Sequence, residues 1–74
     1  MINTKELKKL LIDKDLTIND VAAYIEKSYS NTLLKINGKI PITLNEAEKI
    51  QLFLDIDDCD FGFYFLGHER NDDV

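Results

Sequence analysis

The sequence predicts an all-α fold, a compact bundle of four to five short helices, and three observations lead to this prediction. Apolar residues recur at helical spacing in four successive stretches of the chain. A Thr or Ser that can cap a helix precedes the stretches, and the connections between them are short. Short helices joined by tight turns can bury their apolar faces only against one another. We expect one domain over residues 1–70 and a frayed acidic tail over residues 71–74.

Local signals define the first two helices. The first is expected over about residues 5–12, and the Asp-Lys-Asp of residues 13–15 ends it. Thr17 then forms a capping box with Asp20, three places on, so a second helix is expected over about residues 18–26. The apolar face of the first helix consists of Leu7, Leu10 and Leu11. The face of the second consists of Ile18, Val21, Ala22 and Ile25.

The third helix is short. Ser28 is its candidate N-cap, Asn37-Gly38 ends it, and Pro41 prevents the following segment from continuing it. Its repeating positions are Tyr29, Thr32, Leu33 and Ile36. We expect Thr32 and Ile36 to face the core, whereas Tyr29 suits either the core or the surface.

A fourth helix follows Thr43, which forms a second capping box with Glu46. Its expected inner face consists of Leu44, Ala47, Ile50 and Leu54. The last element is ambiguous, because Phe61, Tyr64 and Phe65 have helical spacing whereas Phe61, Phe63 and Phe65 alternate as in a strand. We favour a short helix.

Charge is distributed unevenly along the chain. The formal net charge is −5. Residues 1–42 hold seven Lys and five acidic residues, whereas residues 43–74 hold two basic and nine acidic residues. A protein that binds nucleic acid usually presents a basic face, so only the first part of the chain has the charge that such a role requires.

Several function classes lack the residues they need. No stretch is long and apolar enough to span a membrane, and no secretory signal is recognisable, so we expect a cytoplasmic protein. Cys59 has no Cys or His partner at zinc-ligand spacing, and the aspartates at 55, 57, 58 and 60 lack the Gly and Glu of a calcium loop. His68 has no nucleophile or carboxylate at a diagnostic spacing. We therefore expect no enzyme activity, no metal site and no cofactor.

Between Leu7 and Leu66 the sequence resembles the lambda-repressor-like helix-turn-helix family, the Cro and C1 type of phage and prophage regulators. The resemblance rests on Leu16-Thr17, residues 21–25 (Val-Ala-Ala-Tyr-Ile), Ser28, residues 35–39 (Lys-Ile-Asn-Gly-Lys) and residues 44–47 (Leu-Asn-Glu-Ala), which fit without a gap. Ala22 matters because two helices that cross steeply over a short turn need a small residue where they meet.

The resemblance implies a transcriptional regulator that binds a double-stranded DNA operator as a dimer, with its third helix in the major groove. It places Tyr29 and Ser30 nearest the bases and Lys35, Asn37 and Lys39 at the phosphates. The full set of DNA-binding positions that it implies is Ser28, Tyr29, Ser30, Asn31, Lys35, Asn37 and Lys39.

Some positions depart from the family pattern. Ile18 replaces a Gln that often donates to phosphate, Glu26 replaces the Gly of the turn, and Lys27 replaces an apolar residue. Leu33 and Leu34 stand at base-reading positions but cannot form hydrogen bonds with bases. These two leucines favour an alternative, in which the same fold binds a protein and acts as an antirepressor, a partner of a larger repressor or a phage inhibitor of a host defence protein.

The aromatic cluster near the end has more apolar area than one face of a short element can bury. One interpretation is a homodimer contact and the other is completion of a small core. The cluster consists of Phe61, Phe63, Tyr64, Phe65 and Leu66.

Overall fold

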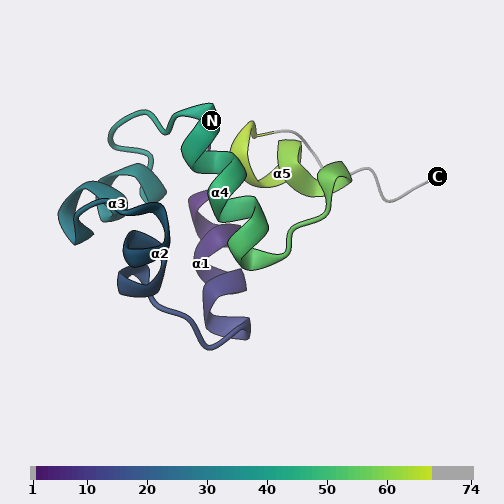
Figure 1. Ribbon diagram of the computed structural model, residues 1–74. Helices are drawn as coiled ribbons and strands as arrows, with labels where there is room; N and C mark the ends of the chain where they lie inside the picture. The colour runs from purple at the N-terminus through teal and green to yellow at the C-terminus, as the bar shows by residue number, and fades with distance from the viewer. Residues whose placement is uncertain (1, 68–74) are drawn as a thin grey trace.

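The computed structural model describes residues 2–67, which form five α-helices and a single 3₁₀ turn, with no strand in that range (Figure 1). The all-α prediction is confirmed, and the ambiguous last element is a helix. In chain order the elements are α1 (Thr4–Asp13), α2 (Ile18–Ile25), α3 (Tyr29–Ile36), α4 (Leu44–Leu54), the 3₁₀ turn η1 (Asp58–Asp60) and α5 (Phe61–Phe65). The predicted tail and His68 lie outside the described residues.

Side-chain caps set the beginnings of the first four helices. Thr17 forms the predicted capping box with Asp20, and Thr43 forms the one with Glu46. The Ser28 hydroxyl accepts a hydrogen bond from the Asn31 backbone amide at 3.1 Å. These bonds satisfy amides that the first turn of a helix would otherwise leave without a partner.

The start of α1 differs from the sequence expectation. Asn3 caps the helix, and Thr4 lies inside its first turn. The Thr4 hydroxyl donates to the Ile36 carbonyl at 2.6 Å and so ties α1 to the end of α3. A contact between residues 32 positions apart leaves no signal in the local sequence.

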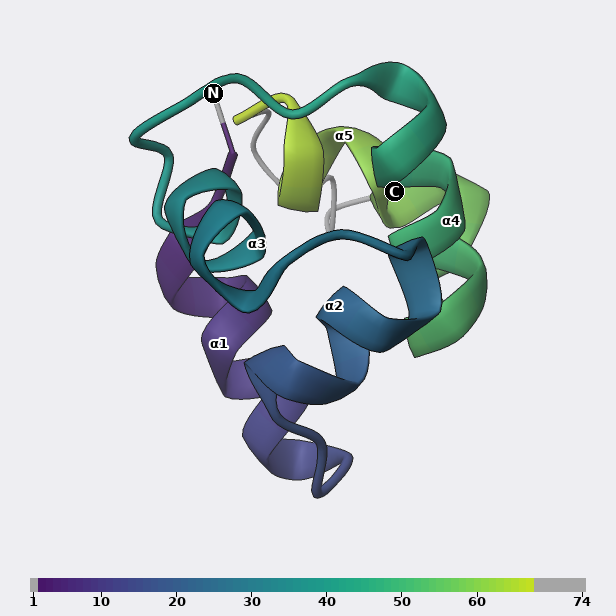
Figure 2. The same ribbon diagram turned by 60° about the vertical axis from the view of Figure 1, so that its left-hand side comes forward.

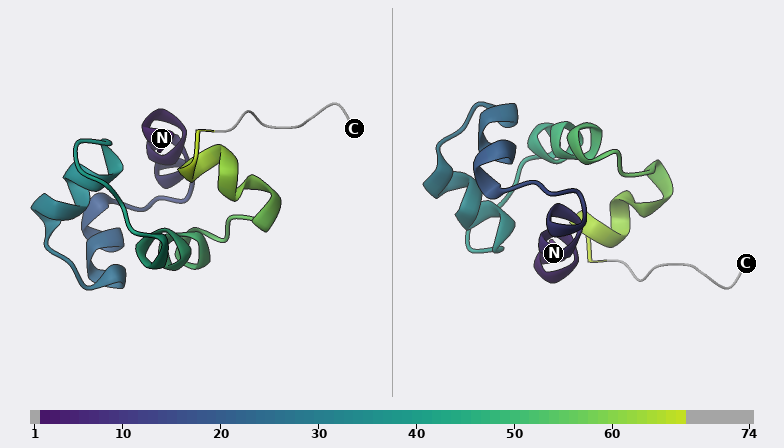
Figure 3. Two further views of the ribbon diagram at one scale, coloured as in Figure 1. Left: turned by 90° about the horizontal axis from the view of Figure 1, so that it is seen from above. Right: turned by 90° about the horizontal axis from the view of Figure 1, so that it is seen from below.

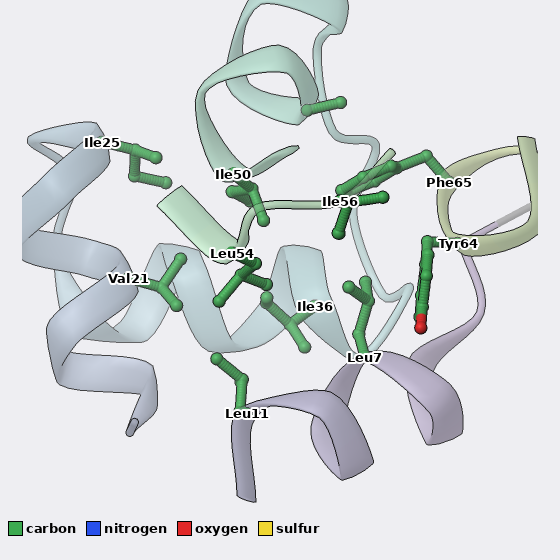
Figure 4. Packing of buried hydrophobic residues seen from close by; sticks show 11 residues of the cluster. Leu7, Leu11, Val21, Ile25, Ile36, Ile50, Leu54, Ile56, Tyr64 and Phe65 are labelled. Carbon is green, nitrogen blue, oxygen red and sulfur yellow. The ribbon is translucent and has the colours of Figure 1, made fainter. Parts of the chain in front are cut away.

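One core contains residues from all five helices and from the segment after α4 (Figure 4). Full burial of each large apolar side chain contributes roughly 1.5–3 kcal/mol, so this shared core is the main force that orients the short helices. The labelled core residues in the figure are Leu7, Leu11, Val21, Ile25, Ile36, Ile50, Leu54, Ile56, Tyr64 and Phe65.

The prediction that Leu44 faces the core is wrong, because its side chain is 66% exposed. Leu44 is the first residue of α4, and the inward stripe of that helix begins two and three residues later, at Glu46 and Ala47. The first two residues of α4 therefore lie past the edge of the core.

The helices are arranged so that α2 and α3 lie at one end of the molecule and η1 lies at the other (Figures 1 and 3). The longest extent of the molecule is 39 Å. α1, α4 and α5 occupy the space between the two ends. No helix among the described residues is long and apolar enough to cross a bilayer.

Candidate nucleic-acid interface

Helices α2 and α3 form a helix-turn-helix arrangement, joined by a turn of three residues, 26–28. Figure 2 looks almost down the axis of α3 while α2 lies across the view, so the two helices cross steeply. Ala22 is buried, which agrees with the expectation of a small residue close to this turn. Helix α3 packs against α2, and one side of α3 is exposed to solvent.

The turn depends on a left-handed backbone at Glu26, with φ 60° and ψ 43°. The Lys27 amide donates to the Ala22 carbonyl at 3.0 Å, and the Glu26 amide donates to the Ala23 carbonyl at 3.3 Å. This is the conformation that a Gly adopts without steric cost and that a residue with a Cβ adopts at a cost. The chain therefore makes the expected turn with an unfavourable residue.

Helix α3 has one buried and one exposed side. Thr32 and Ile36 are fully buried, and the Thr32 hydroxyl donates to the Ser28 carbonyl at 2.8 Å. Tyr29 is 48% exposed and Leu34 is 40% exposed. The ambiguity over Tyr29 is thus resolved in favour of the surface.

The remaining predicted DNA-binding residues surround this exposed side. Ser28, Ser30 and Asn31 are exposed at the N-terminal end of α3. At the other end, Asn37 is half-buried at the C-cap and Lys39 is exposed in the following loop. Five of the seven predicted positions are therefore exposed, Asn37 is half-buried, and Lys35 is the exception among the charged ones.

The side chain of Lys35 is turned against the protein, where its ammonium group forms an ion pair with Glu46 of α4. The two side chains are only 15% and 6% exposed. The other carboxylate oxygen of Glu46 accepts a hydrogen bond from the Thr43 amide at 3.0 Å. Sequence reasoning found the capping box of Glu46 but not this ion pair, which joins residues 11 positions apart on different helices.

Glu46 is ionised in this environment. Burial of the carboxyl opposes ionisation, but its hydrogen bonds with Lys35 and Thr43 and the positive charge of Lys35 outweigh burial and hold the pKa of Glu46 below its ordinary value. The Glu46 carboxyl is therefore a carboxylate at neutral pH.

The residues proposed for a dimer contact are divided between core and surface. Tyr64 and Phe65 are buried in the core of the chain itself, and Phe61 and Phe63 are partly buried against it. The Phe61 and Phe65 rings contact each other with centroids 4.9 Å apart. Leu66 is the most exposed of the five, and it lines a shallow apolar hollow with Leu44, Ile42, Ala47, Phe61 and Phe65. The dimer contact stays a prediction. Among the five residues, Leu66 has the largest exposed fraction that such a contact could bury.

Metal-ligand atoms come together at one place in the described residues. Asp57, Cys59 and Asp60 have ligand atoms within 4.8 Å of one another around η1. Asp57 and Cys59 are exposed, and the group lies at the opposite end of the molecule from α3. The expected absence of a metal site stays a prediction.

Comparisons with known proteins returned no match: no protein-family model, no curated protein and no solved structure matches this chain. The lambda-repressor-like resemblance thus stays a prediction from the sequence.

Proposed function

We propose that the protein binds double-stranded DNA in the cytoplasm as a phage- or prophage-type transcriptional regulator, with α3 entering the major groove. The observation that supports this most directly is the presentation of α3. Thr32 and Ile36 anchor it in the core, and Tyr29, Ser30 and Asn31 stand exposed at its N-terminal end. In helix-turn-helix proteins the N-terminal residues of the second helix contact base edges.

The spatial distribution of charge also supports DNA binding. The acidic residues at 55, 57, 58 and 60 lie around η1, at the far end of the molecule from α3 (Figure 3). Electrostatic interactions between exposed charges are largely screened beyond about 8 Å at physiological salt. Near α3, Lys27 and Lys39 are exposed and form no salt bridge within the described range. The aspartates around η1 therefore contribute little to the potential at α3, where the exposed charges are Lys27, Lys39 and the acidic Glu26.

The proposal is tested by fluorescence anisotropy with duplex DNA from the chain's own promoter region, first at low salt. Lys39→Ala should weaken binding to all sequences alike, because a phosphate contact carries no sequence information. Ser30→Ala should change the preference among operators. Lys14→Ala is the control, since it removes the same charge from the exposed end of α1, away from α3. Absence of a complex at micromolar protein and low salt would refute the proposal.

A second candidate function, binding of a protein partner through α3, is favoured by the exposed Leu34 and Tyr29 and by the neutralisation of Lys35. An apolar, weakly charged helix face suits a protein groove better than a polyanion. A pull-down from host or phage lysate, with and without nuclease, separates the two functions. Under this alternative, capture survives nuclease, Leu34→Lys abolishes it and Lys39→Ala leaves it unchanged.

We further propose a homodimer as the DNA-binding form, because operator recognition by this class pairs two recognition helices. The apolar hollow at Leu44 and Leu66 is the candidate contact. Equilibrium ultracentrifugation that finds only monomer at tens of micromolar would contradict it.

A further inference from the structure

The ion pair between Lys35 and Glu46 is partly buried, and it joins α3 to α4. Lys35 belongs to the last turn of α3, and Glu46 to the first turn of α4. Both oxygens of the Glu46 carboxylate are engaged, one by Lys35 and one by the Thr43 amide. The pair therefore connects α3, the start of α4 and the loop that precedes it.

Lys35 cannot leave this pair for a DNA phosphate without a penalty. Its departure would leave the Glu46 carboxylate, which is 6% exposed, without its counter-charge. An uncompensated buried charge is far more costly than the loss of a surface ion pair. The exposed Lys39 carries no such restraint.

We infer that Glu46 is a positioning residue for DNA binding, which retains Lys35 inside the protein and so limits the number of phosphates that the α3 region neutralises. This inference rests on the proposed function. According to this inference, the ion pair of Lys35 orients α3 against α4. The phosphate contacts near the end of α3 then come from Lys39 and from the backbone around Asn37. Glu46 thus sets how strongly the region attracts DNA of any sequence.

The test is the salt dependence of DNA affinity for Glu46→Gln against Glu48→Gln. Gln keeps the oxygen that accepts from the Thr43 amide and is itself found in capping boxes, so α4 retains its cap. Glu48 is exposed on the same helix, so its substitution makes the same change in net charge without releasing a lysine.

Glu46→Gln should behave as though it had gained one phosphate contact. Each phosphate contact steepens the fall of log affinity with log salt concentration by about 0.9. Between about 50 and 200 mM salt, the DNA affinity of Glu46→Gln should therefore fall about 3.5-fold more than the DNA affinity of Glu48→Gln. The double variant Lys35→Met with Glu46→Gln should return to the slope of the natural chain. Equal slopes for Glu46→Gln and Glu48→Gln, with both variants folded by amide NMR, would overturn the inference.

A second measurement does not depend on DNA. Limited acetylation followed by mass spectrometry gives the reactivity of Lys35 relative to Lys39 within the same molecule. The ratio should be low in the natural chain and in Glu48→Gln, and several-fold higher in Glu46→Gln. If the reactivity ratio is the same in Glu46→Gln as in the natural chain, Glu46 does not hold Lys35, and the inference is overturned. If the ratio rises but no variant forms a DNA complex, Glu46 does hold Lys35, and the proposed function is refuted.

Discussion

Replacing Glu26 by Gly should stabilise the fold by roughly 0.5–1 kcal/mol. A left-handed backbone costs a residue with a Cβ roughly 1–2 kcal/mol, and Gly removes that cost while giving back part of it through the greater freedom of the unfolded chain. The hydrogen bonds of the turn come from backbone amides, so they survive the substitution. The Glu26 side chain is exposed and forms no ion pair within the described range.

The assay is thermal and urea unfolding followed by circular dichroism. For a domain of this size the gain corresponds to a rise in Tm of about 2–8 °C. Glu48→Gly is the matched control, because it makes the same chemical change at an exposed position inside α4. There Gly should cost about 1 kcal/mol. A Glu26→Gly midpoint at or below that of the natural chain would refute the argument that the turn is strained.

Three further predictions concern other contacts. Gly38→Ala should cost about 1 kcal/mol in urea unfolding, because Gly38 has φ +74°, a backbone conformation that strains a residue with a Cβ; an unchanged midpoint would count against it. Since the folded-state pKa of Glu46 lies below its ordinary value of 4.5, the stability that the ionised carboxylate contributes is present above pH 4.5 and is lost as the pH falls through the folded-state pKa. The free-energy difference between the natural chain and Glu46→Gln should therefore shrink on acidification, and a constant difference would contradict the lowered pKa. If the exposed Leu34 contacts a thymine methyl, replacing thymine by uracil in the operator should weaken binding about fourfold for the natural chain, from about 0.8 kcal/mol per apolar carbon, and should leave Leu34→Ala unaffected.

The helices could be predicted from the sequence because their signals are local. Thr17, Ser28 and Thr43 each accept a hydrogen bond from an amide three residues ahead, as their positions indicated. The helical spacing of apolar residues is also read within one or two turns. Both kinds of signal are contained in short windows of sequence, so element order and approximate bounds followed without knowledge of packing.

The candidate site could be predicted only in part, because its remaining features depend on which elements meet. The exposure of Leu44 reflects where the core ends along α4, and the ion pair of Lys35 reflects the position of α4 beside α3. The sequence places Lys35 at a phosphate because the family that it resembles meets the DNA backbone around the end of the third helix. The partner that engages it, Glu46, already had a complete local explanation as a capping residue.

The orientation of α3 depends on its packing against α2 and on contacts with α1 and α4 outside the helix-turn-helix. An isolated helix of eight residues is far below the length that is stable in water. Burial of Ile36 in the shared core, the hydrogen bond from Thr4 of α1 to the Ile36 carbonyl and the ion pair from Lys35 to α4 hold the C-terminal half of α3 from three sides. The N-terminal half, with Tyr29 and Ser30, is held by the Ser28 cap and the strained turn at Glu26. The half of α3 that would meet the bases is therefore fixed by its cap and the turn, whereas its C-terminal half is packed against α2 and is also tied to α1 and α4.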